Sequence, residues 1–304
     1  MIQRTDVEFL SDGQMCRAWL YMPETIKTPP VVVMGHGLGA VREMRLDAYA
    51  ERFCSEGYAA LVFDYRHFGA SEGTPRQLID INRQLQDWES ALTFVRTRSD
   101  VDRNRIVLWG TSFSGGHVLV TAANDKNDKN DQKIKAVISQ CPFTDGFSSS
   151  LAADIRTSLK VGGFAILDKI GSLLGLPPLM VKTSGKPHTA AMMTAPDADS
   201  GYLALVPEGL DFKNKIPARL ALDIPLYSPG KKTPEIQCPV MFCICEKDSV
   251  APSKATLRHA RRAPKAEIKT YPKGHFEIYV GEDFERVVND QIGFLNRHVP
   301  VTAA

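Results

Sequence analysis

A short segment of the chain, residues 110–116 with the sequence Gly-Thr-Ser-Phe-Ser-Gly-Gly, has the composition of a turn that presents a serine hydroxyl. An apolar run that predicts a strand precedes it, and an apolar run that predicts a helix follows it. A tight turn in this setting holds the hydroxyl clear of the sheet edge, provided that small residues stand two positions to either side. The start of the helix also favours negative charge on a bound oxygen. The segment therefore indicates a nucleophilic serine.

Two serines of this segment compete for that role. With Ser112 as nucleophile, the two small positions fall on Gly110 and Ser114. With Ser114, they fall on Ser112 and Gly116, so each register lacks one glycine of the Gly-x-Ser-x-Gly pattern. We favour Ser112, because it stands where the predicted strand ends, whereas Ser114 falls within the predicted helix. A serine that only caps the helix is the remaining alternative.

A serine hydroxyl is a weak nucleophile and needs a base to take its proton. Among the seven histidines, His275 stands in a loop directly after the predicted strand 266–271. The carboxyl ends of parallel strands are where sites form in α/β proteins, so the position of His275 suits a base. We therefore predict that His275 accepts the proton of the serine.

The base in turn needs a carboxylate that orients it and stabilises its charged form. Asp248 lies in the loop between the predicted strand 240–245 and a helix that is expected to begin near Pro252. Glu246, in the same loop, and Asp145, just past another predicted strand, are alternatives. An aspartate in such a loop can also serve only as a turn or cap residue. Asp248 is our prediction.

Cleavage of an acyl bond also needs donors for the oxygen that becomes negatively charged. The turn at 36–40, His-Gly-Leu-Gly-Ala, follows the predicted strand that begins at Pro30 and offers flexible backbone at the expected place. The backbone amides of Leu38 and Phe113 are the predicted donors. A glycine-rich turn can instead cradle a phosphate, but this one lacks P-loop spacing and no lysine follows it.

The elements that must position these residues alternate between short branched apolar runs and longer amphipathic stretches. This rhythm is typical of a parallel sheet with helices on both faces. A hairpin is predicted at 6–22 with its turn at Asp12-Gly13, and an apolar stripe predicts a helix over 76–96. Further helices are predicted near 43–56 and up to about Ala123. Strands are predicted at 30–37, 59–65, 105–110, 136–142, 240–245 and 266–271.

The rhythm breaks between the fourth of these strands and the fifth. Some 90 residues separate them, far more than an ordinary loop holds, so we expect a folded insertion. We predict a core of residues 1–145 and 237–304 with an inserted lid at 146–236, built from a few short helices that lie across the sheet. A helical excursion that only enlarges the core is the alternative. The polar repeat at 124–132 is predicted to be a solvated connector.

Composition excludes several classes of function. The chain has 304 residues, 43% hydrophobic and 24% charged, as in ordinary globular proteins. Its 37 basic and 35 acidic residues leave a net charge of +2, too little to indicate nucleic acid or an anionic membrane as partner. A small molecule is the expected partner. Whether the chain forms a homodimer is left open by the sequence.

The cysteines and the start of the chain bear on its environment. Six cysteines are too sparse for a disulfide scaffold, so reduced thiols are expected. A zinc site at Cys238, Cys243 and Cys245 is an alternative that lacks a second pair of ligands. The first residues, 1–8, show neither the apolar core nor the cleavage site of a signal peptide, and the sequence has no run of 18 apolar residues. We therefore expect a cytoplasmic protein without cofactor or metal.

Taken together, these motifs resemble those of α/β-hydrolases over nearly the whole chain. The resemblance lies in His36-Gly37, the segment 64–71, the turn at Ser112, and the acid–base pair in the order Asp248, His275. It implies an eight-stranded, mostly parallel sheet with helices on both faces. Segments 110–117 and 274–279 are similar to hydrolases allied to the X-prolyl dipeptidyl peptidases and to fungal polyketide thiohydrolases and acyltransferases of the fumagillin transferase family. These relatives also tolerate serine at position 114.

The expected function is that of a cofactor-independent serine hydrolase which cleaves carboxylic esters or thioesters through an acyl-enzyme. Ser112 would attack the acyl carbon, His275 would move the proton, Asp248 would orient the imidazole, and the amides of Leu38 and Phe113 would bind the oxyanion. The apolar residues of the insertion favour an aliphatic or aromatic acyl chain. Two alternatives remain: acyl transfer to an alcohol or amine, and a catalytically silent protein that binds a ligand.

Overall fold

The structure is a computed structural model that describes residues 2–125 and 133–301. The polar repeat predicted to be a connector falls for the most part, at 126–132, outside the described residues. The prediction that this repeat is a solvated connector stays untested.

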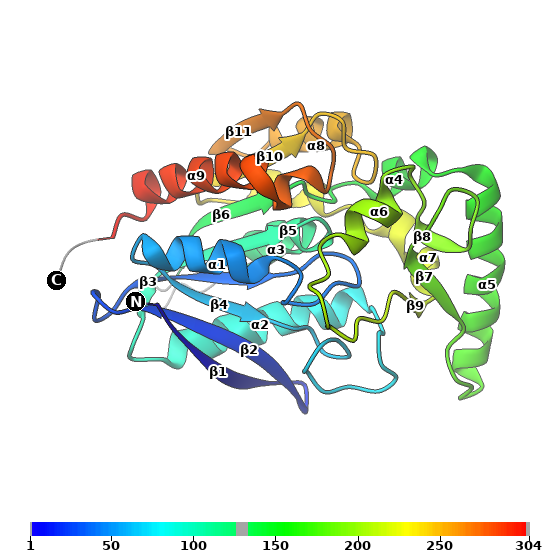
Figure 1. The fold of residues 1–304 in the computed structure, drawn as a ribbon, viewed down its shortest axis with the longest axis horizontal. Helices are drawn as coiled ribbons and strands as arrows, with labels where there is room; N and C mark the ends of the chain where they lie inside the picture. The colour runs from blue at the N-terminus through cyan, green and yellow to red at the C-terminus, as the bar shows by residue number, and fades with distance from the viewer. Residues whose placement is uncertain (1, 126–132, 302–304) are drawn as a thin grey trace.

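Eight strands form one sheet in the order β1-β2-β4-β3-β5-β6-β10-β11 (Figure 1). The β1–β2 and β2–β4 pairs are antiparallel, and all other neighbours in this sheet are parallel. Central strands such as β3, β4 and β10 are buried throughout, because helices cover both faces. The predicted sheet is confirmed. Its strands are β1 Ile2–Ser11, β2 Gln14–Pro23, β3 Pro30–Gly35, β4 Ala59–Phe63, β5 Asp102–Thr111, β6 Ile134–Gln140, β10 Val240–Cys245 and β11 Ala266–Tyr271.

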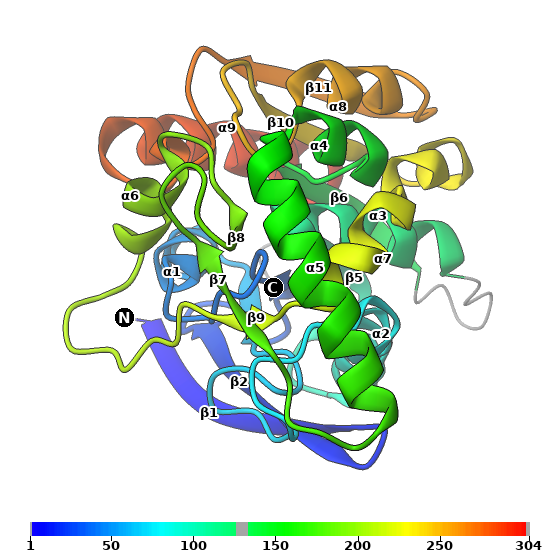
Figure 2. The same ribbon diagram turned by 90° about the vertical axis from the view of Figure 1, so that its right-hand side faces the viewer.

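Helices cover the two faces of this sheet. Helices α1 and α9 pack on one face, and α2, α3 and α8 pack on the other (Figures 1 and 2). None of the helices in the described ranges combines the length and the apolar character that a membrane crossing requires. The core helices are α1 Leu46–Ser55, α2 Ile81–Thr97, α3 Phe113–Asn124, α8 Ser253–Ala260 and α9 Gly281–His298, with the 3₁₀ turn η3 at Glu277–Tyr279.

The helix predicted over 76–96 begins five residues later than expected. Asp80 is its N-cap and accepts a hydrogen bond from the amide of Arg83, 3.1 Å away. Gln77 has a φ of 67°, which a helix does not allow. The predicted start is wrong because the apolar spacing continues through the loop before Asp80, whereas the helix begins only after this capping residue.

The segment between β6 and β10 differs from the predicted group of short helices. Its main element is a helix of 19 residues, α5, which Figure 2 shows running across one end of the molecule. A second sheet, in the order β8-β7-β9, lies beside it. The prediction of short helices alone is therefore wrong. The elements are α4 Gly146–Ala152, α5 Ile155–Leu173, β7 Met180–Ser184, β8 Ala191–Met193, α6 Ala198–Leu203, β9 Ile216–Pro217, α7 Leu220–Asp223, η1 Ile224–Leu226 and η2 Pro229–Glu235.

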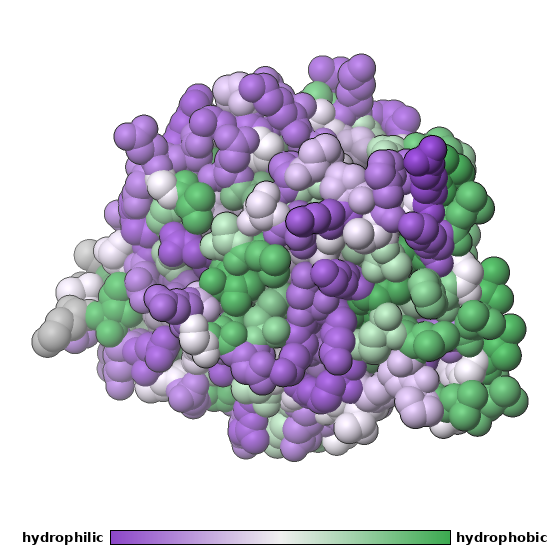
Figure 3. All heavy atoms as spheres, turned by 45° about the vertical axis from the view of Figure 1, so that its right-hand side comes forward, coloured by the Kyte–Doolittle hydropathy of each residue, from purple (hydrophilic) through white to green (hydrophobic). Residues whose placement is uncertain are grey.

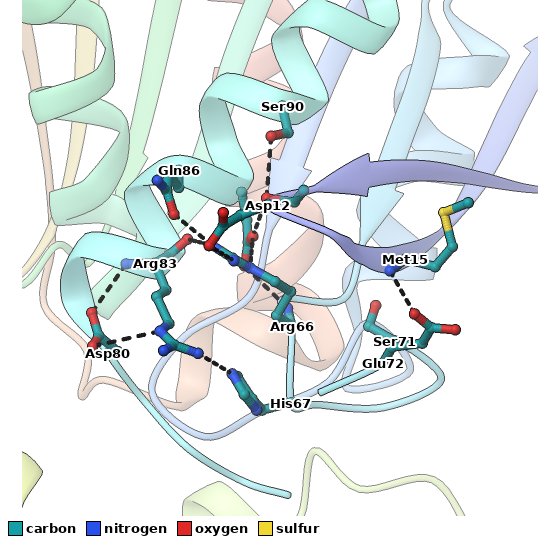
Figure 4. Close-up of polar contacts among 12 residues, drawn as sticks. Asp12, Met15, Arg66, His67, Ser71, Glu72, Asp80, Arg83, Gln86 and Ser90 are labelled. Atoms are coloured by element: carbon teal, nitrogen blue, oxygen red, sulfur yellow. Dashed lines mark hydrogen bonds and ion pairs between the residues drawn. The ribbon is translucent and has the colours of Figure 1, made fainter. Parts of the chain in front are cut away.

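A buried arginine ties the hairpin turn to α2 and to the loop after β4. The Arg66 guanidinium donates to Asp87 Oδ1 at 2.6 Å and contacts Asp12 Oδ2, in the hairpin turn, at 3.1 Å. It also donates to the Arg83 carbonyl and to Gln86 Oε1 (Figure 4). Because the side chain is 2% exposed, these partners must replace the water it loses. The motif at 64–71 thus has a structural role.

Candidate active site

Ser112 stands between the last residue of β5 and the first residue of α3, in a backbone conformation that L-residues rarely adopt. Its φ is 57° and its ψ is −118°. Strand and helix approach closely around it: a Cβ at Gly110 would lie 2.3 Å from the Ser114 carbonyl oxygen, and one at Gly116 would lie 2.3 Å from the Phe143 carbonyl oxygen. Such a strained turn persists only where its surroundings hold it. The glycines at 110 and 116 are needed for that reason.

Ser114 is the second residue of α3 and points into the core. Its Oγ lies 2.7 Å from the hydroxyl of Tyr65, which in turn accepts a hydrogen bond from Trp88 Nε1 at 2.8 Å. A Cβ at Gly35 would stand 2.8 Å from Ser114 Oγ, so glycine in β3 makes the room that serine takes here. This packing explains how the chain departs from Gly-x-Ser-x-Gly at position 114.

The structure brings the three residues predicted for acyl chemistry into one hydrogen-bonded line. His275 Nε2 lies 3.0 Å from Ser112 Oγ, and His275 Nδ1 lies 2.7 Å from Asp248 Oδ2. We assign the tautomer in which Nδ1–H donates to the carboxylate and Nε2 accepts from the serine. Asp248 also accepts from the amides of Val250 and Ala251, which fix its orientation. The order is that of nucleophile, base and orienting acid.

The charge of Asp248 tunes the base. Burial opposes the charged form of His275, but the charge and hydrogen bond of Asp248, together with the nearby Cys141, outweigh the effect of burial, and the pKa of His275 lies well above its ordinary value of 6.5. Burial acts without such compensation on His117, whose pKa falls to about 3. The pair therefore stabilises the imidazolium that proton transfer would create.

The two alternative carboxylates lie elsewhere. Asp145 caps α4 by accepting from the amide of Ser148 at 2.9 Å, and it pairs with Arg258 at 2.6 Å. Glu246 is exposed to solvent. Asp248 is thus the predicted carboxylate that reaches the imidazole.

Leu38 and Phe113, whose amides are the predicted oxyanion donors, line the same cavity as Ser112. In the described part of the chain, neither donates a hydrogen bond to another group of the protein. Phe113 begins α3, so its amide has no partner within the helix. The loop that carries Leu38 is held by Tyr202, whose hydroxyl donates to the Leu38 carbonyl at 2.9 Å, and by the Asp64 carboxylate, which accepts from the Arg42 amide at 2.9 Å. Two backbone amides without a partner in the described part of the chain therefore belong to residues that line the same cavity as Ser112.

Ser112, Leu38 and Phe113 line a cavity of about 330 Å³. Apolar groups dominate its walls, and most of them come from the segment between β6 and β10. A second space, of only about 30 Å³, lies on the side of His275. Wall residues of the large cavity include Phe143, Val161, Gly162, Ala191, Met193 and Ile224.

Sequence reasoning missed three groups that border the site. Cys141 Sγ lies 3.9 Å from His275 Nε2 and 3.4 Å from the hydroxyl of Tyr279, which also contacts Thr111 Oγ1. Cys141 directly follows β6 at the same sheet edge, so the rule that selected Asp248 would also have selected it. No motif in the sequence singles out its thiol.

The zinc alternative finds no support in the positions of the cysteines. Cys243 and Cys245 lie in the buried strand β10 as free cysteines. Within the described ranges, no three histidine, cysteine or acidic side chains are grouped to hold a metal ion.

Comparison with known proteins agrees with this arrangement. Residues 31–290 match the alpha/beta hydrolase family. The chain is 59% identical to the quorum-quenching protein AidA of Acinetobacter baumannii over 97% of this chain and 95% of AidA. It is 28% identical to the thiohydrolase aneE of Aspergillus aculeatus over 96% and 92% of the two chains.

A solved structure extends the likeness. The alpha/beta hydrolase GrgF of a Penicillium species matches with a TM-score of 0.81 and 26% identity, over 97% of this chain and 99% of GrgF. The curated polyketide transferase grgF of a Penicillium species is likewise 26% identical over 98% of both chains. The predicted resemblance to these relatives is confirmed. The chain belongs to the alpha/beta hydrolase family and is an enzyme of the hydrolase class.

Proposed function

We propose that the enzyme is a serine hydrolase that cleaves carboxylic esters or thioesters through a covalent acyl-enzyme. The observation that carries this proposal is the line from Ser112 Oγ through His275 to Asp248, at the mouth of an apolar cavity. A hydroxyl, an imidazole and a carboxylate at these distances need no further group to activate the nucleophile.

In the first half of the reaction, Ser112 Oγ attacks the acyl carbonyl carbon while its proton moves to His275 Nε2. The amides of Leu38 and Phe113 donate to the oxygen that becomes negatively charged. The bond from the acyl carbon to the leaving oxygen or sulfur then breaks, and His275 returns the proton to the departing alcohol or thiol. In the second half, water attacks the acyl-serine by the same route, which releases the acid and restores Ser112.

The insertion at 146–236 serves in this proposal as a lid that binds the acyl chain. Val161 and Gly162 of α5 and Ala191 of β8 form walls of the cavity beside the two oxyanion donors. The space next to His275, from which the leaving group departs, is about a tenth of that size. We infer an apolar acyl chain in the large cavity and a small leaving group or water on the opposite side.

The names of the relatives refine the substrate. The Acinetobacter relative is named a quorum-quenching protein, and the Aspergillus relative is named a thiohydrolase. We propose a small-molecule ester or thioester with an apolar acyl group. The polyketide transferase name of the Penicillium relative keeps acyl transfer as the second candidate.

A matched panel of methyl esters and methyl thioesters, with acyl groups from acetyl to dodecanoyl, tests the proposal on purified enzyme. Turnover that rises with chain length and vanishes in Ser112→Ala is the expected result. Addition of small alcohols and amines distinguishes transfer, because a new ester or amide would then exceed the free acid. Absence of turnover for every acyl compound, with the fold intact, would favour a protein that only binds its ligand.

A further inference from the structure

Most of the exposed large apolar side chains of the described residues lie in the insertion. Among the described residues, the exposed large hydrophobic side chains all lie in 146–236 except Ile2, Leu10 and Val280. Figure 3 shows them as a green area on the side of the molecule that carries α5. We use the name α5 surface for the exposed apolar side chains between residues 147 and 179.

The size of the α5 surface exceeds what a monomer usually tolerates. Its leucine, isoleucine and phenylalanine side chains are between 41% and 78% exposed. Together they present on the order of 1,000 Å² of apolar area, against roughly 300–600 Å² for the largest patch on a typical monomer. About 800 Å² per partner is enough for a stable protein interface. The area therefore suits a permanent partner.

A straight stripe runs along the outer side of α5. Its members recur every three or four residues, the spacing that places them on one helix face, and they extend over about 27 Å. The buried residues Val161 and Ala165 occupy the opposite face. The outward stripe consists of Ile155, Leu159, Gly163, Ile166, Ile170 and Leu173.

A glycine stands near the middle of this stripe without a reason inside the monomer. A Cβ at Gly163 would meet no atom within 4 Å, so no neighbouring chain segment requires the missing side chain. Glycine inside a helix costs about 1 kcal/mol relative to alanine. It does allow another helix backbone to come close at that point.

We propose that the α5 surface is the dimer interface of this enzyme, where the α5 helices of two copies cross antiparallel at Gly163. The stripe extends eight residues before Gly163 and ten after it, so a two-fold axis at this glycine matches each half with the other half of the partner. Ile155 of one copy then lies near Leu173 of the other. This proposal does not depend on the catalytic one.

A lipid surface is the competing occupant, and the glycine decides against it. Lipid tails adapt to side chains of any size, so a membrane contact would not favour a missing side chain at the centre of the stripe. A close helix crossing does favour it, because the distance between the helix axes is set by the residues at the crossing point.

Sedimentation velocity of the full-length enzyme at about 1–100 µM tests the dimer. The wild type is expected to be dimeric. Ile166→Glu, which puts a charge into the apolar stripe on either side of the crossing, is expected to raise the dimer Kd at least 100-fold, and Gly163→Leu, which pushes the helices apart, at least tenfold. Leu10→Glu is the matched control: Leu10 is 62% exposed on the β1–β2 hairpin, and this change should leave the dimer intact.

The orientation is tested by a short bis-maleimide cross-linker. Ile166→Cys is expected to cross-link to itself within the dimer, whereas Ile155→Cys is not, because its two copies lie at opposite ends of the crossing. A wild type that stays monomeric at 100 µM overturns the proposal, as does a dimer that survives both Ile166→Glu and Gly163→Leu. A monomer that cosediments with phosphatidylglycerol vesicles, and loses this binding in Ile166→Glu, would assign the surface to lipid instead.

Discussion

The sheet core and the insertion differ in how far they bury their side chains. In the core, even the Arg66 guanidinium is buried, and carboxylate, amide and carbonyl oxygens surround it. In the insertion, Leu173 is apolar and 78% exposed. The core is complete within one chain, whereas the insertion turns one side of α5 to a cavity and another to solvent. Under the two proposals made above, reaction chemistry would reside in the core, and selection of ligand and partner would reside in the insertion.

If the core carries the chemistry, loss of the nucleophile must abolish it for every substrate alike. Ser112→Ala is expected to lower kcat by more than about 10⁴-fold for both acetyl and long-chain esters. Steady-state rates across the ester panel measure this. Ser114→Ala serves as the control and should retain most of the activity. An inactive Ser114→Ala variant beside an active Ser112→Ala variant would assign the nucleophile to Ser114, two residues further along the chain.

The orienting carboxylate is the second core group. Asp248→Asn is expected to lower kcat about 10³-fold, again without regard to chain length. His275 must be neutral to accept a proton, so kcat/KM of the wild type should fall as the pH drops through a value above 6.5. Because the Asp248 charge raises the pKa of His275, the residual activity of Asp248→Asn should show this fall at lower pH. An unchanged pH profile would contradict the role of Asp248.

Two adjacent glycines of α5 allow substrate binding and dimer formation to be tested separately. Gly162 lines the cavity, Gly163 lies on the outward stripe, and a Cβ at either would meet no atom within 4 Å. Gly162→Leu adds four carbon atoms to the cavity and should lower kcat/KM for dodecanoyl esters roughly 10- to 100-fold, with little effect on acetyl esters. Gly163→Leu should leave both rates unchanged. Equal effects of the two variants would remove the distinction between the two sides of α5.

The smallest effect on activity is expected from a change beneath the serine turn. Tyr65→Phe leaves the Ser114 hydroxyl and the Trp88 indole N–H without their shared partner, at a cost of about 1–3 kcal/mol of stability. Thermal unfolding should therefore show a melting temperature lower by several degrees. Ester turnover at 25 °C should stay within a few-fold of the wild type. A large loss of activity would place Ser114 in the reaction.

The sequence predicted those site residues whose place depends only on their position after a strand. Ser112, Asp248, His275 and Leu38 each follow a parallel strand, and the topology of the sheet alone brings such residues to one edge. The hairpin turn was equally readable, because Asp12 and Gly13 both adopt the positive φ that Asp-Gly favours.

The insertion was less predictable for physical reasons. Helix α5 carries apolar residues on nearly all sides and two glycines at its centre, which weaken both the periodicity and the propensity on which a helix prediction depends. Strands β8 and β9 have three and two residues, too few to show an alternating pattern. The side chain of Ser114 likewise depends on room left by Gly35 in another strand, which no local pattern records.

Mass spectrometry of the enzyme after reaction with a fluorophosphonate tests the catalytic account most directly. Such probes form a covalent bond with a serine that a neighbouring base activates. The account predicts one phosphonyl group per chain, on the peptide that contains Ser112, and none in His275→Ala. An unmodified protein, or a phosphonyl group on Ser114, would contradict it.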